Sequence, residues 1–180
     1  MPDVKSVAVF CGASSSIPKE FLDEGYRFGK MIAEHGLQMV YGAGSTGLMG
    51  IIADGCLSAR GKVIGVYPST LDGIEPEHKH LTETFFVDSM HTRKMKMFDR
   101  ADAFVILPGG FGTMDETFEV ITWKQLHTHD KPIILYNYKG FWDNWLKLTD
   151  QFINMGFAGA RTRTMYNVVD TAEGVFEKLR

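Results

Sequence analysis

Residues 108–119, with the sequence PGGFGTMDETFE, place a glycine-rich loop directly before the predicted start of a helix. The free N–H groups and partial positive charge of a helix N-terminus attract phosphate, and glycines let a loop wrap an anion. The loop does not match an ATP-hydrolysing Walker loop, because no Lys-Ser or Lys-Thr follows its glycines. Asp115, Glu116 and Glu119 follow instead, and each would repel a bound phosphate. These carboxylates therefore need an explanation of their own.

One explanation for the carboxylates is purely structural. Thr113-x-x-Glu116 matches a capping box, in which the Thr113 hydroxyl accepts from the Glu116 N–H and the Glu116 carboxylate reaches back to the Thr113 N–H. Asp115 favours the same positive end of the helix dipole. The other explanation is a catalytic carboxylate, and the helix that precedes this loop bears on the choice.

That preceding helix, predicted over 89–101, carries cations where a helix disfavours them. The sequence DSMHTRKMKMFDRA places Arg93 and Lys94 in the first turns after a cap at Ser89. Each charge opposes the helix dipole at a cost of about 0.3 kcal/mol or more. This helix follows a predicted strand of a parallel sheet, so both residues lie near the sheet edge where such folds bind ligands. An anion or a carboxylate there offsets the cost. We therefore expect Arg93 to meet Glu116.

Short apolar runs rich in β-branched residues alternate with longer amphipathic runs along the chain. Near-continuous apolarity is typical of strands covered on both faces, and the alternation predicts right-handed crossovers. We expect a single nucleotide-binding α/β domain over residues 1–180, with a doubly wound, mostly parallel sheet of about seven strands and helices on both faces. Strands are expected at 6–10, 37–41, 62–68, 84–88, 103–108, 132–137 and 165–169. Helices are expected at 18–35, 46–60, 89–101, 113–127, 141–155 and 171–179.

Three loops rich in small residues follow predicted strands: CGASSS, GAGSTG and GGFGT. A parallel sheet brings all three to one edge, and doubly wound sheets bind ligands there, where the strand order reverses. Gly42, Gly44 and Gly47 complete a G-x-G-x-x-G motif, but the next strand ends VIGVYPST without the carboxylate that a dinucleotide site requires. Two interpretations of these glycines stay open: a tight turn with close helix packing, or a contact to a mononucleotide.

The composition limits the classes of partner. The 180 residues carry a net charge of −3, which offers no electrostatic attraction to nucleic acid or to a membrane surface. No apolar run reaches the length of a membrane span, and no signal peptide opens the chain. Cys11 and Cys56 lie in apolar stretches and indicate reduced thiols in a cytoplasm-like compartment. We expect a cytoplasmic protein that binds a small-molecule nucleotide, and neither nucleic acid nor membrane.

The histidines do not predict a metal site. His78-x-His80 and His127-x-His129 lie in polar segments and lack a third ligand at a suitable spacing. Cys11 has no evident base partner and is interpreted as a small core residue. We therefore expect neither a metal nor a cofactor.

The paired motifs MHTRK and PGGFGTMDE resemble the M-H-x-R-K and P-G-G-x-G-T-x-x-E signature of the Lonely-Guy family, the cytokinin riboside 5′-monophosphate phosphoribohydrolases. FCGASS, VYGAGSTGLMG, VIGVYP and VITWKQLHTHDKPIILYN are also similar to that family, so the resemblance covers nearly the whole chain. It implies a Rossmann-like fold, usually a homodimer, that cleaves the N-glycosidic bond of an adenine nucleotide to the free base and ribose 5-phosphate. The same signature is often labelled lysine decarboxylase-like, but no lysine here has a recognisable pyridoxal-phosphate context.

Carried over by position, the resemblance implies that Arg93 and Glu116 are the catalytic pair. Ile74 stands where the family usually has an arginine, directly before one of the implied substrate contacts. The implied substrate contacts are Glu75, Lys94, Gly110, Phe111, Gly112, Thr113, Met114, Asp115 and Thr122.

These roles suggest why carboxylates follow a phosphate loop. Gly110, Gly112 and Thr113 would hold the phosphate, while Glu116 faces the ribose, where cleavage builds oxocarbenium-like positive charge. Arg93 would keep Glu116 ionised and polarise the departing base or hold the substrate. Two other functions stay open: a non-catalytic nucleotide or pterin-cofactor carrier, which needs the loops but not the Arg–Glu pair, and a deoxyribosyltransferase-like enzyme. The residues do not separate AMP from N6-prenylated substrates.

Overall fold

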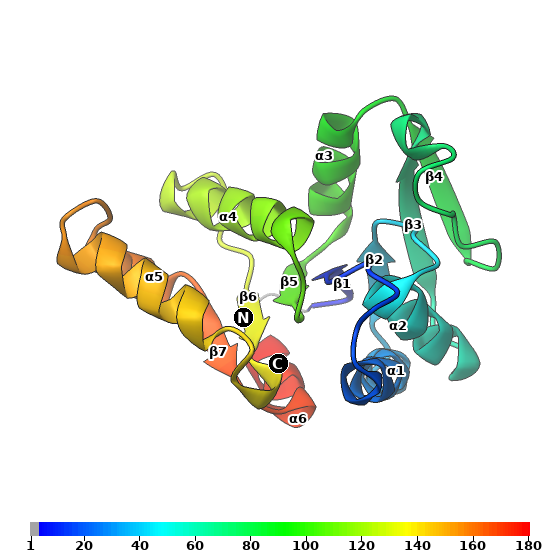
Figure 1. The fold of residues 1–180 in the computed structure, drawn as a ribbon, viewed down its shortest axis with the longest axis horizontal. Coiled ribbons are helices and arrows are strands. Elements are labelled where there is room, and N and C mark those ends of the chain that lie inside the picture. Colours follow the sequence, from blue (N-terminus) through cyan, green and yellow to red (C-terminus); the bar gives the residue numbers. More distant parts are fainter. Residues whose placement is uncertain (1–3) are drawn as a thin grey trace.

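The computed structural model describes residues 4–180, and Figure 1 shows them as a twisted central sheet with helices on both sides. The seven strands of the sheet lie in the order β4-β3-β2-β1-β5-β6-β7, and every neighbouring pair is parallel. The expected doubly wound α/β sheet is confirmed. The strands are β1 (Ser6–Phe10), β2 (Gln38–Tyr41), β3 (Val63–Pro68), β4 (Glu83–Val87), β5 (Ala103–Ile106), β6 (Ile133–Tyr136) and β7 (Asn167–Val169).

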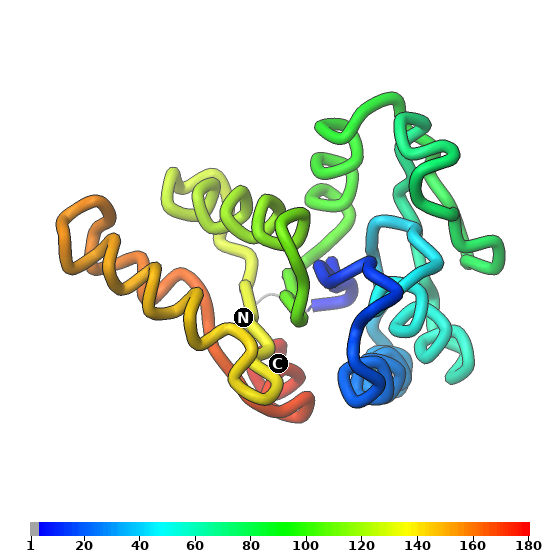
Figure 2. Tube along the Cα trace, in the orientation of Figure 1, coloured from blue at the N-terminus to red at the C-terminus, as the bar shows by residue number. Residues whose placement is uncertain are grey.

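Helices cover both faces of the sheet, as the chain trace in Figure 2 also shows. Buried residues of α1, α2 and α6 join one core cluster, and buried residues of α3 and α4, with Trp142 and Trp145 around the start of α5, join the other. None of the helices in the described residues is long and apolar enough to cross a membrane. The helices are α1 (Lys19–Glu34), α2 (Gly47–Ser58), α3 (Met90–Arg100), α4 (Phe111–Gln125), α5 (Asp143–Asn154) and α6 (Ala172–Leu179).

The central strands are apolar on both faces because each face packs against a helical layer. In β1, Val7 and Val9 belong to the cluster under α1, α2 and α6, whereas Ala8 and Phe10 belong to the cluster under α3 and α4. Successive side chains of a strand point to opposite faces, so one short apolar run serves both cores. This two-sided burial is why these strands read as continuous apolar runs in the sequence.

The strand order reverses at β1, which pairs with β2 on one side and β5 on the other. The carboxyl ends of β1 and β5 therefore lie side by side, and the Gly12 N–H donates to the Pro108 carbonyl at 3.0 Å. The start of α2 joins them: the Leu48 N–H donates to the Gly12 carbonyl at 2.9 Å, and the Thr46 hydroxyl donates to the Ala13 carbonyl at 2.9 Å. The three small-residue loops thus meet at the switch point, where such sheets bind ligands.

The N-termini of α3 and α4 test the two capping predictions. Ser89 caps α3, because its hydroxyl accepts from the Thr92 N–H at 3.1 Å. The capping box at Thr113 is wrong, because α4 begins at Phe111 with Gly110 as its N-cap. Thr113 therefore lies within the first turn, and the structural explanation for Glu116 fails.

Candidate active site

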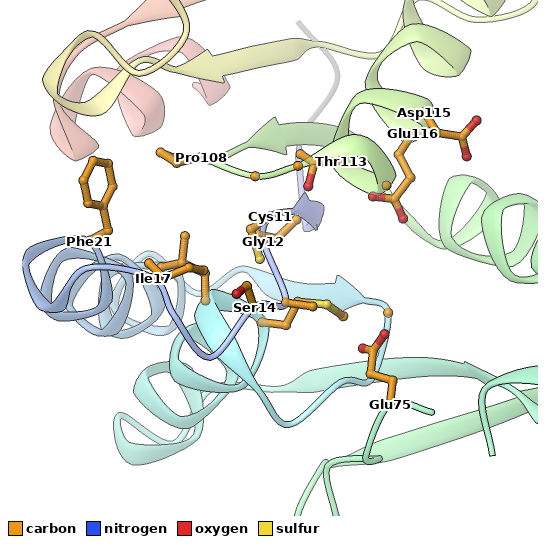
Figure 3. Close-up of a pocket in the computed structure, with 18 of the residues that line it drawn as sticks. Cys11, Gly12, Ser14, Ile17, Phe21, Glu75, Pro108, Thr113, Asp115 and Glu116 are labelled. Carbon is orange, nitrogen blue, oxygen red and sulfur yellow. The ribbon is translucent and has the colours of Figure 1, made fainter. Parts of the chain in front are cut away.

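A cavity of about 460 Å³ opens at the switch point, between the loops that follow β1, β2 and β5. One end is polar and contains Glu75, Arg93 and Glu116, whereas an apolar end is lined by Ile17, just before α1, and Phe21, in its first turn. Figure 3 shows Glu75 and Glu116 on opposite sides of the polar end. The volume falls in the range of sites for small molecules, roughly 300–1,000 Å³.

The loop between β5 and α4 supplies unpartnered backbone donors to this cavity. No side chain caps α4 at Gly110, and the first N–H groups of a helix have no acceptor within the helix. A Cβ added at Gly110 or Gly112 would meet nothing within 4 Å, and neither residue has a positive φ. The protein itself gives no steric reason for glycine at these two positions. A ligand that approaches the backbone closely gives one, and an anion fits the helix end.

Arg93 enters the polar end from the first turn of α3 and is 6% exposed. Its Nη2 donates to the Gly42 carbonyl at 2.7 Å, and its Nε donates to the Val66 carbonyl at 3.3 Å. Both acceptors are uncharged, and no direct ion pair joins Arg93 to a carboxylate in the part of the chain that the structure describes. A buried cation without an anionic partner is costly, so its charge remains available to a ligand or to a carboxylate nearby.

Glu116 lies one turn into α4, half-buried, and faces the same cavity as Arg93. Burial raises the pKa of Glu116 to about 7, although the Arg93 guanidinium favours the ionised form and opposes this rise. Arg93 and Glu116 therefore line the same cavity, but the direct contact expected between them is not found among the described residues. Arg93 was expected to keep Glu116 ionised; its guanidinium does favour the ionised form, but desolvation outweighs this attraction and leaves the pKa near neutral. A carboxyl group that titrates near neutral pH suits proton transfer.

Glu75 faces the cavity from the loop between β3 and β4. Its Oε1 is buried and has no hydrogen-bond partner among residues 4–180. Its backbone is fixed, because its N–H donates to the Leu71 carbonyl at 3.1 Å and its carbonyl accepts from the Tyr67 hydroxyl at 2.8 Å. A buried acceptor without a donor costs free energy, so this oxygen is prepared for a donor group that arrives with a ligand.

The first two glycines of the G-x-G-x-x-G motif leave room for the Arg93 and Glu75 side chains. A Cβ at Gly42 would lie 1.8 Å from Arg93 Nη2, and a Cβ at Gly44 would lie 2.0 Å from Glu75 Oε1. Gly47 has a φ of +60° and lies against the backbone of Ala13. The interpretation as close packing is therefore supported, with the packed groups being the site residues themselves.

Comparisons with known proteins decide which family these features belong to. A family model described as "Possible lysine decarboxylase" matches residues 49–179. The chain is 41% identical over 175 residues to a probable cytokinin riboside 5′-monophosphate phosphoribohydrolase of Oryza sativa subsp. japonica, covering 97% of this chain and 77% of that relative. It is 37% identical over 175 residues to a cytokinin riboside 5′-monophosphate phosphoribohydrolase of Arabidopsis thaliana, covering 97% and 82%. This chain belongs to the Lonely-Guy family.

Solved structures show the same fold at low sequence identity. A molybdenum cofactor binding protein from Rippkaea orientalis aligns with a TM-score of 0.72 and 18% identity, over 96% of this chain and 93% of that chain. The molybdenum cofactor carrier protein of Chlamydomonas reinhardtii aligns with a TM-score of 0.70 and 18% identity, over 96% and 94%. At this identity the likeness concerns the fold alone.

The Lonely-Guy resemblance predicted from the paired motifs is thus confirmed, and the structure places the residues that it implied. Phe111 is 97% exposed, Met114 packs against the core, and Thr122 is exposed farther along α4. Lys94 lies outside the cavity lining and ties α3 to α4. The implied residues that line the cavity are Glu75, Arg93, Gly110, Gly112, Thr113, Asp115 and Glu116.

Lys94 has partners within the protein instead of facing the cavity. Its Nζ lies 3.1 Å from both Asp115 Oδ2 and Glu119 Oε1, and its side chain is 11% exposed. These two carboxylates raise the pKa of Glu116 and Lys94 lowers it, all more weakly than burial raises it. The carboxylates that follow the glycine-rich loop therefore differ in their partners: Asp115 and Glu119 pair with Lys94, whereas Glu116 faces the cavity and Arg93.

Sequence reasoning missed part of the cavity wall of this Lonely-Guy protein. Cys11, interpreted as a small core residue, is buried and also lines the cavity, and burial raises the pKa of its thiol well above the usual range. Phe141 reaches the apolar end from a 3-10 turn after β6, far along the chain. No local pattern marks Phe141, whereas the CGASSS loop after β1 gave a signal for the wall beside Cys11.

The description "Possible lysine decarboxylase" does not suit this cavity. A pyridoxal-phosphate enzyme requires a lysine that forms a Schiff base with the cofactor. No lysine among the described residues lines the cavity, and the nearby Lys94 is held by two carboxylates.

Proposed function

We propose that this protein hydrolyses the N-glycosidic bond of adenine nucleoside 5′-monophosphates, releasing the free base and ribose 5-phosphate. The substrates are AMP, a cytokinin riboside 5′-monophosphate, or both. One observation carries the proposal: a single cavity combines unpartnered amides at a helix start, a buried arginine without an anionic partner, and a carboxyl group whose pKa is about 7. The names of the relatives at 37–41% identity support the same activity.

The proposed reaction assigns each group to one part of the nucleotide. The amides of residues 110–113 and the Thr113 hydroxyl bind the phosphate. Glu116 faces the ribose, where its carboxylate stabilises the positive charge that develops on the anomeric carbon and takes a proton from the attacking water. The bond from that carbon to the base breaks and the water oxygen bonds to the carbon. The departing base nitrogen gains a proton, which balances the one that Glu116 takes from the water, so that one water is consumed. Arg93 lowers the pKa of Glu116 and stabilises negative charge on the substrate.

The apolar end of the cavity suits the base. Ile17, Phe21 and Phe141 line it, and the Phe21 and Phe141 rings pack edge to face with centroids 6.1 Å apart. Aromatic and aliphatic walls bind a purine ring or an apolar N6 substituent by burying it from water. A comparison of AMP with isopentenyladenosine monophosphate will show whether this end selects between the two.

We also propose a cytoplasmic homodimer. Phe111, Phe118 and Met90 expose apolar side chains on α3 and α4, at 97%, 38% and 38% exposure, and a second copy that covers them would bury this surface. Cys11 and Cys56 are both free and buried, which suits a reducing compartment. Light scattering coupled to size-exclusion chromatography tests the dimer, and a monomeric mass would contradict it.

The carrier alternative has support from the fold alone, because the structural neighbours named as molybdenum cofactor proteins share only 18% identity. One assay separates the functions. The protein is incubated with AMP or isopentenyladenosine monophosphate, and free base and ribose 5-phosphate are quantified by chromatography. Binding without release of base favours the carrier, and transfer of the sugar to an added second base favours a transferase. Release to water from either nucleotide supports the hydrolase.

A further inference from the structure

The connection between β3 and β4 contains no α-helix, unlike most connections of this fold. It consists of a short 3-10 turn followed by residues 72–82, here named the Glu75 loop, which returns along the α2 side of the sheet. Without a helix, the loop has few local hydrogen bonds to hold its shape. Its position must therefore come from contacts with the rest of the fold.

The Glu75 loop is bound along its length to the loop that follows β2. The Ser45 N–H and hydroxyl both donate to the Pro76 carbonyl, at 2.9 and 3.0 Å, and the His78 N–H donates to the Ala43 carbonyl at 2.9 Å. Gly44 and Glu77 form an isolated antiparallel β-bridge. Ala43 has a φ of +63°, which is unfavourable for a residue with a side chain. Such strain persists only where surrounding contacts enforce it.

His78 anchors the far side of this arrangement to α2. Its ring is 6% exposed, and its Nε2 lies 2.9 Å from Asp54 Oδ1. The His80 N–H donates to His78 Nδ1 at 3.2 Å, so Nδ1 is an acceptor and Nε2 carries the proton that it donates to Asp54. Both ring nitrogens of a neutral imidazole are thereby satisfied. Neither His78 nor Asp54 lines the cavity.

The Glu75 loop keeps the Glu75 carboxylate in the cavity, although this side chain would gain free energy by rotating toward water. Glu75 Oε1 is buried beside Gly44 with no donor, and an unpartnered buried acceptor gains free energy by rotating toward water. A loop free to shift would let it do so. The anchoring contacts on the other side of the loop oppose this relaxation, because they fix the backbone three residues away from Glu75.

We propose that His78 and Asp54 are positioning residues for substrate binding: together they fix the Glu75 loop so that the Glu75 carboxylate stays in the cavity, ready to accept a donor group of the nucleotide. This inference rests on the proposed function, because the donor is taken to be a hydroxyl or amino group of a nucleoside monophosphate. His78 and Asp54 act only through Glu75, so their effect must vanish when the Glu75 side chain is removed.

A double-mutant cycle tests that dependence. Asp54→Ala removes the acceptor for His78 at a side chain that is 56% exposed, so the fold tolerates the change. The dissociation constant of AMP is measured by calorimetry for Asp54→Ala, Glu75→Ala and the double variant, all carrying Glu116→Gln so that AMP turnover is slowed. We expect Asp54→Ala to weaken AMP binding about five- to tenfold when Glu75 is present, and less than about twofold in the Glu75→Ala background.

Two matched variants separate positioning from general stability. Asp54→Asn keeps an oxygen acceptor for His78 Nε2 and should restore AMP affinity to within about twofold of the parent. Lys79→Ala removes an exposed lysine of the same loop that pairs with Glu77, and it should leave AMP affinity unchanged in both backgrounds.

The outcomes distinguish this inference from the proposed function. An equal loss of AMP affinity in both Glu75 backgrounds, or no loss at all, overturns the positioning role while the hydrolysis assay on the native protein stands on its own. Failure of the native protein to release base from AMP or from isopentenyladenosine monophosphate overturns the proposed function, whatever the cycle shows. Loss of affinity only with Glu75 present, rescued by Asp54→Asn, supports the positioning role.

Discussion

Replacing Glu116 with Gln separates the catalytic role of this side chain from its effect on stability. Gln has nearly the shape of a protonated Glu but cannot carry the negative charge that stabilises an oxocarbenium-like transition state. We expect kcat for base release to fall about 10²- to 10³-fold, while KM changes by less than about threefold. Near-normal release of base by purified Glu116→Gln protein would refute the catalytic assignment.

The same substitution should stabilise the protein at alkaline pH. Burial raises the pKa of Glu116 from 4.5 to about 7, so ionising it in the fold costs up to about 3 kcal/mol. The stability that the protonated carboxyl contributes is fully present below the unfolded value of 4.5 and is lost as pH rises through 7. Solvent reaches the half-buried group, so we expect about 1–2 kcal/mol in practice.

Thermal unfolding by calorimetry measures this difference. At about pH 8, Glu116→Gln should unfold about 3–6 °C above the native protein, whereas at about pH 4 the two should agree within about 1 °C. A matched change at Glu119, which pairs with Lys94 and does not line the cavity, should give no such gain. Equal unfolding temperatures of Glu116→Gln and the native protein at both pH values would show that burial does not perturb Glu116 as the structure indicates.

Three further perturbations follow from named contacts. Gly42→Ala places a Cβ 1.8 Å from Arg93 Nη2, so the guanidinium must move. The value of kcat/KM, measured by base release, should then fall at least about 100-fold. An unchanged kcat/KM would contradict the assigned place of Arg93. Gly110→Ala meets nothing within 4 Å, so the unfolding temperature should stay within about 2 °C while KM for AMP rises; an unchanged KM argues against phosphate at this loop. Lys94→Met removes a charge that lowers the pKa of Glu116, so the rise of kcat/KM with pH should move to higher pH; a shift to lower pH would reverse the electrostatic argument.

Local patterns in the sequence determined the elements of this fold. The apolar run of β1 predicts a strand because Val7 and Val9 serve one core and Ala8 and Phe10 the other, and two-sided burial leaves a visible signature. Ser89 predicts the start of α3 because a hydroxyl before an amphipathic run is a local signal. The small-residue loops predict a shared edge because parallel strands all end on the same side. These inferences require only neighbours along the chain.

The capping box shows where local reasoning fails. Thr113 and Glu116 have the right types and spacing, but α4 begins two residues earlier, at Phe111, where Gly110 opens it toward the cavity. Sequence spacing alone cannot say which residue begins a helix when glycines permit several starts. In the folded chain the loop after β5 docks against the loop after β1, where the Gly12 N–H donates to the Pro108 carbonyl two residues before the N-cap of α4.

The sequence by itself determined roughly where each element lies and predicted which residues could carry chemistry, because residue types, periodicity and the paired motifs are local properties. Only the tertiary structure decided what Arg93 contacts, that Phe141 reaches the cavity from beyond β6, and that Lys94 binds Asp115 and Glu119 instead of facing the cavity. The charge state of Glu116 belongs to the same group, because its pKa reflects desolvation by segments far apart along the chain. Contacts between distant segments and the dielectric surroundings they create leave no mark in residue spacing.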